Sequence, residues 1–339
     1  MIDISINEAL GTYIPFLPYA LLVIGFIALI KGADFFVDGS ASIAKKFRIP
    51  DIIIGLTVVA MGTSMPELAV SLSSALGGST DMAVGNVVGS NIINVLVILG
   101  LSAVIRPINV DTSVFRRDIP VLLLSAVLLP IMAWAEGGKI SWISGIILTA
   151  LFITYIVLNV RDALKYRREQ ALEIPTVLSD NGAADESEIK QLPLWKSILF
   201  AIGGAALIVV GATLSVDGAT VIAQSIGLSE KVIALTVVAL GTSLPELVTS
   251  VVAARKGNSD IALGNIVGSN IFNVLLILGT TSLVCPAPTD FNGMIDLAVM
   301  LGISVLLAVT AFTGKKLSRI EGASYLVIYG GYLTYLFLR

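Results

Sequence analysis

Long runs of apolar residues dominate this chain and restrict what it can fold into. Hydrophobic residues make up 56% of its 339 residues and charged ones only 13%, which is about half the share typical of a soluble protein. A run of about 20 apolar residues crosses the hydrocarbon core of a bilayer as a helix, because lipid offers no partner to unpaired backbone groups. The runs predict an all-α polytopic membrane protein with ten transmembrane helices. We expect these spans at residues 17–43, 50–76, 82–105, 118–135, 140–160, 196–224, 231–254, 260–283, 293–312 and 320–338.

An internal repeat relates the two halves of the chain. Residues 57–101 align without a gap on residues 236–280, and 28 of the 45 paired positions are identical. A polar stretch at 161–194 lies between the copies and leaves five predicted spans on each side. Because five is an odd number, the second copy crosses the membrane upside down relative to the first. This is the inverted-repeat plan of secondary transporters, whose substrate site lies near the midplane where the repeats meet.

The same pattern predicts the organisation and orientation of the chain. We expect a first five-helix repeat at 1–160, a cytoplasmic linker at 161–194 and a second, inverted repeat at 195–339. If the N-terminus is outside, 17 of the 21 Lys and Arg residues fall on the opposite side of the membrane, which the positive-inside rule places in the cytoplasm. The segment Met1 to Tyr13 has no Lys or Arg and so lacks the basic start of a cleavable signal peptide. We expect a multi-pass protein of the cytoplasmic membrane with both termini outside.

Missing and rare residue types narrow the possible functions. The chain has no histidine, which excludes histidine acid–base catalysis, a histidine zinc site and a Ser–His pair. Its net charge of −3 does not indicate a nucleic-acid partner, and its single cysteine, Cys285, cannot form an intrachain disulfide. An intramembrane hydrolase would need a nucleophile and a base within the membrane. The two spans that carry Glu67 and Glu246 offer no such pair. We therefore expect that this protein is not an enzyme.

Two glutamates at equivalent repeat positions are the sharpest functional signal. Glu67 and Glu246 each follow a proline and lie about two-thirds of the way along an apolar span. An ionised carboxylate at that depth costs at least ~2.5 to 3.5 kcal/mol on insertion scales and needs a partner. No Lys or Arg lies at comparable depth in these spans or in their neighbours. The missing positive charge is most simply a cation from solution.

The residues around the glutamates offer oxygen ligands. Pro66 and Pro245 lack an N–H, which frees backbone carbonyls near Thr63 and Thr242. Hydroxyl and amide oxygens would add to these carbonyls, whereas nitrogen and sulfur donors are missing. Such a set suits a hard cation such as Ca²⁺. The hydroxyls belong to Thr63, Ser64, Thr242 and Ser243, and the amides to Asn91, Asn94, Asn270 and Asn273.

Structural roles compete with binding at several of these positions. Small residues and Ser or Asn side chains in membrane helices also form plain packing seams, and glycines at 85, 89, 264 and 268 would let backbones approach closely. Asp38 and Asp217 recur in the repeat but lie toward the ends of spans, where we expect a structural role. Lys31 and Asp34 are close enough in sequence to pair locally. A duplicated, unpaired buried glutamate fits a packing seam poorly.

The repeated motifs resemble those of the cation/calcium exchanger superfamily, and within it the prokaryotic sodium/calcium exchangers. The motifs are GTSMPE with GNVVGSNIIN in the first half and GTSLPE with GNIVGSNIFN in the second. The resemblance implies ten helices in two inverted halves. In that fold spans 2, 3, 7 and 8 form a compact core, and the long spans 1 and 6 slide against it. It also implies Ca²⁺ and Na⁺ as transported ions, no cofactor, and function as a monomer in the lipid bilayer.

The resemblance further implies roles for individual residues. Glu67 and Glu246 would bind Ca²⁺ directly, with oxygens from Thr63 and Thr242. Asn94 and Asn273 would lie at the centre of the site, beside Asn91 and Asn270. Sodium ions would occupy flanking sites made with Ala60, Thr63, Ser64, Ser90, Ala239, Thr242, Ser243 and Ser269.

One departure leaves the coupling ion open. Several sodium-coupled members resemble this chain but carry Asp at the position of Asn273. Two neutral amides would limit the charge of the site to −2, which matches one Ca²⁺. Proton-coupled relatives usually have Gly-Asn-x-x-Glu where this chain has Gly85 to Gly89, and the Gly-Ser-Asn that follows here is of the sodium type. We therefore favour sodium over protons, with potassium dependence and a channel-like activity also open.

Overall fold

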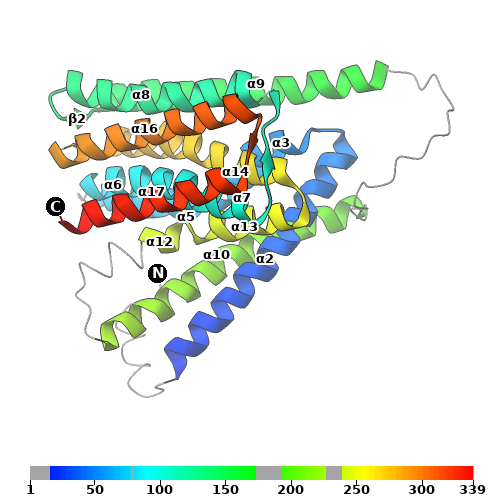
Figure 1. Cartoon of the computed structure of the whole chain (residues 1–339), viewed down its shortest axis with the longest axis horizontal. Coiled ribbons are helices and arrows are strands. Elements are labelled where there is room, and N and C mark those ends of the chain that lie inside the picture. Colours follow the sequence, from blue (N-terminus) through cyan, green and yellow to red (C-terminus); the bar gives the residue numbers. More distant parts are fainter. Residues whose placement is uncertain are drawn as a thin grey trace.

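The computed structural model describes residues 16–77, 80–112, 114–172, 192–226, 239–289 and 291–338. Helices make up nearly all of this part of the chain, together with four two-residue strands (Figure 1). Within these ranges seven helices are long and apolar enough to cross a membrane, and an eighth span results if the bent pair Asp51–Thr63 and Met65–Leu76 counts as one. The chain is thus a multi-pass, all-helical membrane protein, as its apolar runs predict.

The two halves contain matching elements, with π-helical segments written η. The first half has α2 (Leu17–Phe47), α3 (Asp51–Ile54), η1 (Gly55–Val59), α4 (Ala60–Thr63), α5 (Met65–Leu76), α6 (Thr80–Ile93), η2 (Asn94–Leu99), α7 (Gly100–Ile105), β1 (Ile108–Asn109), η3 (Val114–Asp118), α8 (Ile119–Ala135), β2 (Lys139–Ile140) and α9 (Trp142–Leu172). The second half has α10 (Leu194–Ser225), α12 (Ala239–Thr242), α13 (Leu244–Lys256), α14 (Ser259–Phe272), η5 (Asn273–Leu278), α15 (Gly279–Val284), β3 (Ala287–Pro288), α16 (Phe291–Gly314), β4 (Lys316–Leu317) and α17 (Arg319–Leu338).

The predicted spans agree with these helices at most positions. The fifth predicted span, 140–160, is longer in the structure, because α9 runs to Leu172 and continues past the apolar stretch into charged residues. The seventh, 231–254, is described only from residue 239 onward. The tenth, 320–338, is helix α17, which is not among the seven helices apolar enough to pass as spans by composition.

Helices α2 and α10 form a closely packed pair that lies obliquely beside the other helices (Figure 1). Gly32 and Gly204 face each other across this pair and let the two backbones touch. A Cβ atom on Gly204 would lie 2.7 Å from the carbonyl oxygen of Gly32 and 2.5 Å from the backbone nitrogen of Phe36. Close approach at small residues is a common way for membrane helices to associate. The pair can therefore behave as one unit.

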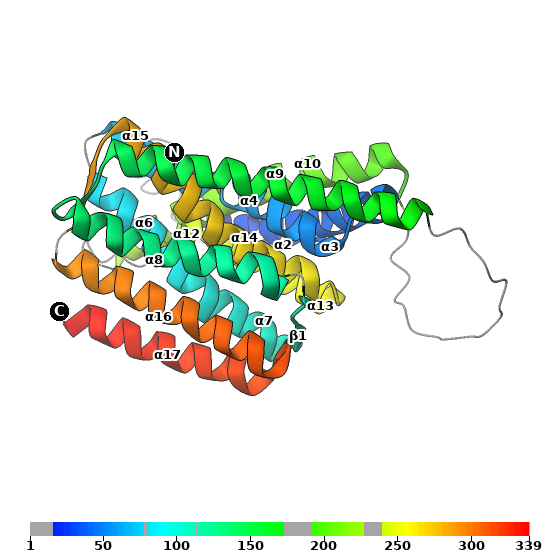
Figure 2. The same cartoon turned by 90° about the horizontal axis from the view of Figure 1, so that it is seen from above.

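Helix α14 lies at the centre of the remaining bundle (Figure 2). The most apolar stretch of Ser259–Val284 is 94% buried within the protein, compared with 33% for that of α2. The close approach expected at Gly264 and Gly268 is present, because Cβ atoms there would lie 2.8 Å and 2.7 Å from backbone carbonyl oxygens of the first half. The repeat equivalents of those contacts, for Gly85 and Gly89, would involve residues 231–235, which lie outside the described ranges.

Two short strand pairs link the halves at opposite ends of the bundle. Strand β1 pairs antiparallel with β4, and β2 pairs antiparallel with β3, so each ladder joins one strand from each half. β2 lies at one end of the bundle in Figure 1, whereas β1 lies at the other end in Figure 2. This arrangement supports the expected inversion of the second half relative to the first.

The acidic residues of α2 pair with a lysine from the second half. Nζ of Lys256 lies 3.2 Å from Oδ1 of Asp34 and 2.7 Å from Oδ1 of Asp38. It also donates to the backbone carbonyl of Asp34 at 3.0 Å. The structure therefore gives Asp34 a partner other than the neighbouring Lys31, because helix packing brings the end of α13 alongside α2. Asp38 has the structural role that its position at the end of a span predicts.

Gly204 and Gly203 allow a matched test of the α2–α10 contact. We expect Gly204→Ala to lower the unfolding temperature of the purified protein, since overpacking against a backbone costs about 1 to 3 kcal/mol. Gly203→Ala should leave it unchanged or raise it slightly, because no described atom outside its own helix lies within 4 Å of a Cβ there and alanine favours helix. Differential scanning fluorimetry measures both, and equal unfolding temperatures would contradict the contact.

Candidate ion-binding site

Each repeat contains a helix break two residues before the proline of its Pro-Glu motif, at Ser64 in the first half and Ser243 in the second. The helix of the first half bends by 46° between Thr63 and Met65, and α5 restarts with Pro66 in its first turn. In the second half α12 ends at Thr242, and α13 restarts with Pro245 in its first turn. A proline has no N–H to donate to the carbonyl four residues earlier. Pro66 and Pro245 therefore cannot donate to the carbonyls of Gly62 and Gly241, which lie next to Thr63 and Thr242.

The serines at the two breaks share one backbone conformation, and their hydroxyls make contacts outside their own helices. Ser64 has φ −87° and ψ 8°, and Ser243 has φ −88° and ψ 2°. Neither side chain caps the helix that it precedes. Each hydroxyl instead turns toward the opposite half of the protein, which is the first contact that joins the two breaks into one site.

The two glutamates meet these serines across the interface between the halves. Both carboxyl groups are buried, with 1% of each residue exposed. The Ser64 hydroxyl donates to Oε1 of Glu246 at 2.6 Å, and the Ser243 hydroxyl donates to Oε1 of Glu67 at 3.5 Å. Since Ser64 lies three residues before Glu67, these crossed contacts bring both glutamates into one pocket. Among the described residues, Oε2 of each glutamate has no hydrogen-bond partner.

Four asparagines form a second crossed set of contacts behind the glutamates. Nδ2 of Asn91 donates to the backbone carbonyl of Asn270 at 3.2 Å, and Nδ2 of Asn270 donates back to that of Asn91 at 3.3 Å. Nδ2 of Asn94 donates to Oδ1 of Asn270 at 2.9 Å, and Nδ2 of Asn273 donates to Oδ1 of Asn91 at 3.0 Å. Within the described part of the chain, Oδ1 of Asn94 and Oδ1 of Asn273 are buried and accept no hydrogen bond.

The remaining predicted residues lie in the same region. Thr63, Ser90 and Ser269 are buried, and Thr242 is 8% exposed. The Ser243 and Ser90 hydroxyls are 3.3 Å apart. Ala60 is buried, and Ala239 begins α12, although its side chain is not described.

Two further asparagines, which the prediction did not assign to the site, hold its threonines in place. Oδ1 of Asn265 accepts from the Thr63 hydroxyl at 3.0 Å, and its Nδ2 donates to the Ser250 hydroxyl at 2.9 Å. Asn86 repeats this arrangement with Thr242 at 3.5 Å and Ser71 at 3.0 Å. Asn86 and Asn265 occupy equivalent positions in the two repeats. This identity is the sequence signal that could have assigned them to the site.

The chemistry of this pocket fits a hard cation. Five buried oxygen atoms of the predicted site residues lack partners among the described residues: Oε2 of Glu67 and Glu246, Oδ1 of Asn94 and Asn273, and Oγ of Ser269. Unpaired buried oxygens are costly unless a ligand completes them. The ion pairs found in the described ranges involve residues near helix ends, such as Arg117 and Lys256, and none reaches the glutamates. An oxygen-rich pocket with net negative character can hold Ca²⁺ or Na⁺.

Comparison with known proteins identifies the class to which this fold and site belong. The family model of the sodium/calcium exchanger protein matches residues 17–161 and 196–338. The chain therefore belongs to the sodium/calcium exchanger family. It is a membrane transporter and not an enzyme.

Individual relatives agree with this assignment. The chain is 40% identical over 300 residues to Inner membrane protein YrbG of Escherichia coli (strain K12), covering 85% of this chain and 87% of that one. It is 34% identical over 343 residues to Sodium/calcium exchanger MaX1 of Methanosarcina acetivorans, covering 94% and 98%. A structure of the sodium-calcium exchanger NCX_Mj is similar with a TM-score of 0.79 and 34% identity, covering 94% and 98%. The fold is that of a solved exchanger.

The crossed asparagine contacts predict a specific stability effect. Asn91→Ala removes the donor to the Asn270 carbonyl and leaves the buried Asn273 amide without its acceptor, which costs about 1 to 3 kcal/mol for each unpaired group. We expect a shorter half-life of the folded protein on heating, followed by size-exclusion chromatography. Ser102→Ala is the control, because the Ser102 hydroxyl is fully buried yet has no hydrogen-bond partner in the described ranges. Equal half-lives for the two variants would contradict a supporting role for the asparagines.

Proposed function

We propose that this protein is an antiporter that exchanges Ca²⁺ for Na⁺ across the cytoplasmic membrane. The observation that carries the proposal is the crossed pair of contacts between Ser64 and Glu246 and between Ser243 and Glu67. It gathers two buried carboxylates from opposite halves at one point, each with one oxygen left for a ligand. Ca²⁺ binds between these two glutamates, with further oxygens from Thr63 and Thr242.

Sodium ions compete for the same pocket and its flanks. Two ionised carboxylates give the site a charge of −2, which one Ca²⁺ or a small number of Na⁺ ions neutralises. Asn94 and Asn273 contribute neutral oxygens at the centre, beside Asn91 and Asn270. The flanking sodium sites use Ala60, Ser64, Ser90, Ala239, Ser243 and Ser269 together with the two threonines.

Exchange follows from the electrostatics of occlusion. A pocket that holds bare carboxylates is costly to close off from water, whereas a cation-loaded pocket is neutralised. The α2–α10 pair lies against the bundle that holds the site, and α2 packs on α13, the helix that carries Glu246. Movement of this pair relative to the bundle opens the site to one side or the other, and it proceeds only with cations bound.

The organisation predicted from the sequence accompanies this mechanism. Residues 1–160 and 195–339 form two inverted repeats, with a cytoplasmic linker at 161–194 and both termini outside. The strand pairs at opposite ends of the bundle support the inversion. Both glutamates and the hydroxyls that contact them belong to the same chain, which supports a monomer as the transporting unit.

One transport experiment tests both the coupling ion and the role of the two glutamates. Proteoliposomes loaded with Na⁺ and diluted into sodium-free buffer should accumulate ⁴⁵Ca²⁺, whereas an imposed proton gradient alone should not drive uptake. Glu67→Gln and Glu246→Gln should reduce sodium-driven uptake to the level of empty liposomes, because each removes a charged ligand. Glu136→Gln is the matched control, since Glu136 bonds Ser141 and Ser144 at the far end of α8.

Each alternative predicts another result. Uptake driven by protons alone would replace sodium by proton coupling, and a requirement for K⁺ would indicate a potassium-dependent exchanger. Calcium current without countertransport would indicate a channel. Retained sodium-driven uptake in either glutamate variant would overturn the pocket.

A second prediction concerns Asn273, whose amide donates to Asn91 while its own oxygen accepts no hydrogen bond from the described residues. Asn273→Asp adds a titratable charge and loses the donor unless the new acid is protonated. We expect calcium transport to persist with a changed ion stoichiometry and a steeper dependence on pH, measured by parallel ²²Na⁺ and ⁴⁵Ca²⁺ fluxes. Ser102→Ala should match the parent protein in both fluxes. An unchanged stoichiometry and pH profile in Asn273→Asp would refute the role of a neutral amide.

A further inference from the structure

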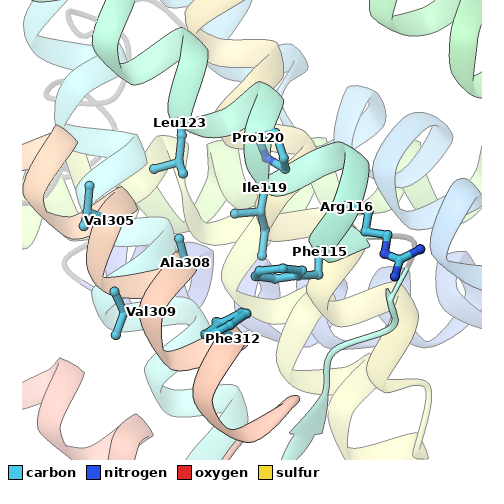
Figure 3. Close-up of a pocket in the computed structure, with 9 residues that line it drawn as sticks. All are labelled: Phe115, Arg116, Ile119, Pro120, Leu123, Val305, Ala308, Val309 and Phe312. Atoms are coloured by element: carbon cyan, nitrogen blue, oxygen red, sulfur yellow. The ribbon is translucent and has the colours of Figure 1, made fainter.

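A hollow lies on the outer surface of the bundle, and none of the ion-site residues lines it. It has a volume of about 400 Å³ and runs between α8 and α16 (Figure 3). Its lining is apolar apart from one residue, Arg116. The lining side chains are Phe115, Arg116, Ile119, Pro120, Leu123, Val305, Ala308, Val309 and Phe312.

The apolar part of the groove faces outward. Val305, Val309 and Phe312 are 45%, 52% and 69% exposed, and they stand on one side of the hollow along α16 (Figure 3). The Phe115 and Phe312 rings pack against each other with centroids 5.4 Å apart. In a helix that crosses a membrane, an exposed apolar side of this kind faces the hydrocarbon of the bilayer. The groove is therefore open to an acyl chain.

One end of the groove is basic. Arg116 is exposed and forms no ion pair within the described residues, whereas its neighbour Arg117 is held by Asp118 and Asp162. Lys315 and Lys316 follow α16 directly, are also exposed, and have no acidic partner in the described ranges. These unpaired cations lie where the helices reach the membrane surface. They suit a phosphate group.

We propose that this groove binds an anionic phospholipid, with an acyl chain between α8 and α16 and the headgroup phosphate at Arg116. Charge and apolar lining together favour this ligand over a neutral lipid, which would gain only the apolar contacts. Near a membrane surface each Lys or Arg contributes about 1 kcal/mol toward an anionic lipid, which corresponds to roughly a five-fold change in affinity.

Native mass spectrometry of the full-length protein in detergent tests the proposal with phosphatidylglycerol and phosphatidylcholine of equal chain length. We expect the protein to bind phosphatidylglycerol several-fold more tightly. Arg116→Gln should weaken the binding of phosphatidylglycerol by about five-fold and leave the binding of phosphatidylcholine unchanged. Ala308→Leu, which fills the floor of the groove, should weaken both lipids. Arg255→Gln is the control, because Arg255 is an exposed arginine on α13, which contributes nothing to the groove.

Three results would overturn the proposal. Arg116→Gln and Arg255→Gln could change phosphatidylglycerol binding equally, which would remove the headgroup site. Ala308→Leu could leave both affinities unchanged, which would remove the acyl-chain site. Glycerol phosphate in excess could displace the lipid, which would identify a soluble phosphate site in place of a lipid site. Circular dichroism of each variant shows whether it is folded.

Discussion

The rest of this structure depends on two carboxylates that are buried inside a membrane protein and have no basic partner among the residues that the structure describes. Each needs donors that do not neutralise it, and the crossed Ser64 and Ser243 hydroxyls supply them from the opposite half. Such contacts form only if the two halves meet at their helix breaks. The prolines that open those breaks, and the residues that hold the breaks together, are thus parts of one solution to the cost of burying Glu67 and Glu246.

The asparagines stabilise the interface on which that solution rests. Their contacts are reciprocal, so a displacement of one half relative to the other breaks several hydrogen bonds together. The π-helical segments η2 and η5 begin at Asn94 and Asn273, and such widened turns are frequent at functional sites. In the proposed mechanism, these contacts hold the core around the pocket together, and the motion needed for exchange is assigned to the α2–α10 pair, which packs through glycines.

Hydropathy predicted most of the helices, and the repeat singled out the glutamates and asparagines that the structure brings into contact across the two halves. These two signals could not predict contacts that arise only when the halves pack together. Asn265 supports Thr63 from the other half, and Lys256 reaches Asp34 across more than half of the chain. The extension of α9 to Leu172 was not predicted for a different reason. A helix can continue into water after its apolar residues end, so hydropathy does not mark its last residue.

The ion pair between Lys256 and Asp34 is present in only one of the two places that the repeat would predict. In the first half the position equivalent to Lys256 is Gly77, and the position equivalent to Asp34 in the second half is Thr213. The contact that joins α2 to α13 therefore has no counterpart of the same kind between α10 and α5. Its side chains are 28% to 41% exposed, so it contributes on the order of 1 kcal/mol or less. In the proposed mechanism the protein alternates between two access states, and a contact of this size that forms in only one of them would make their populations unequal.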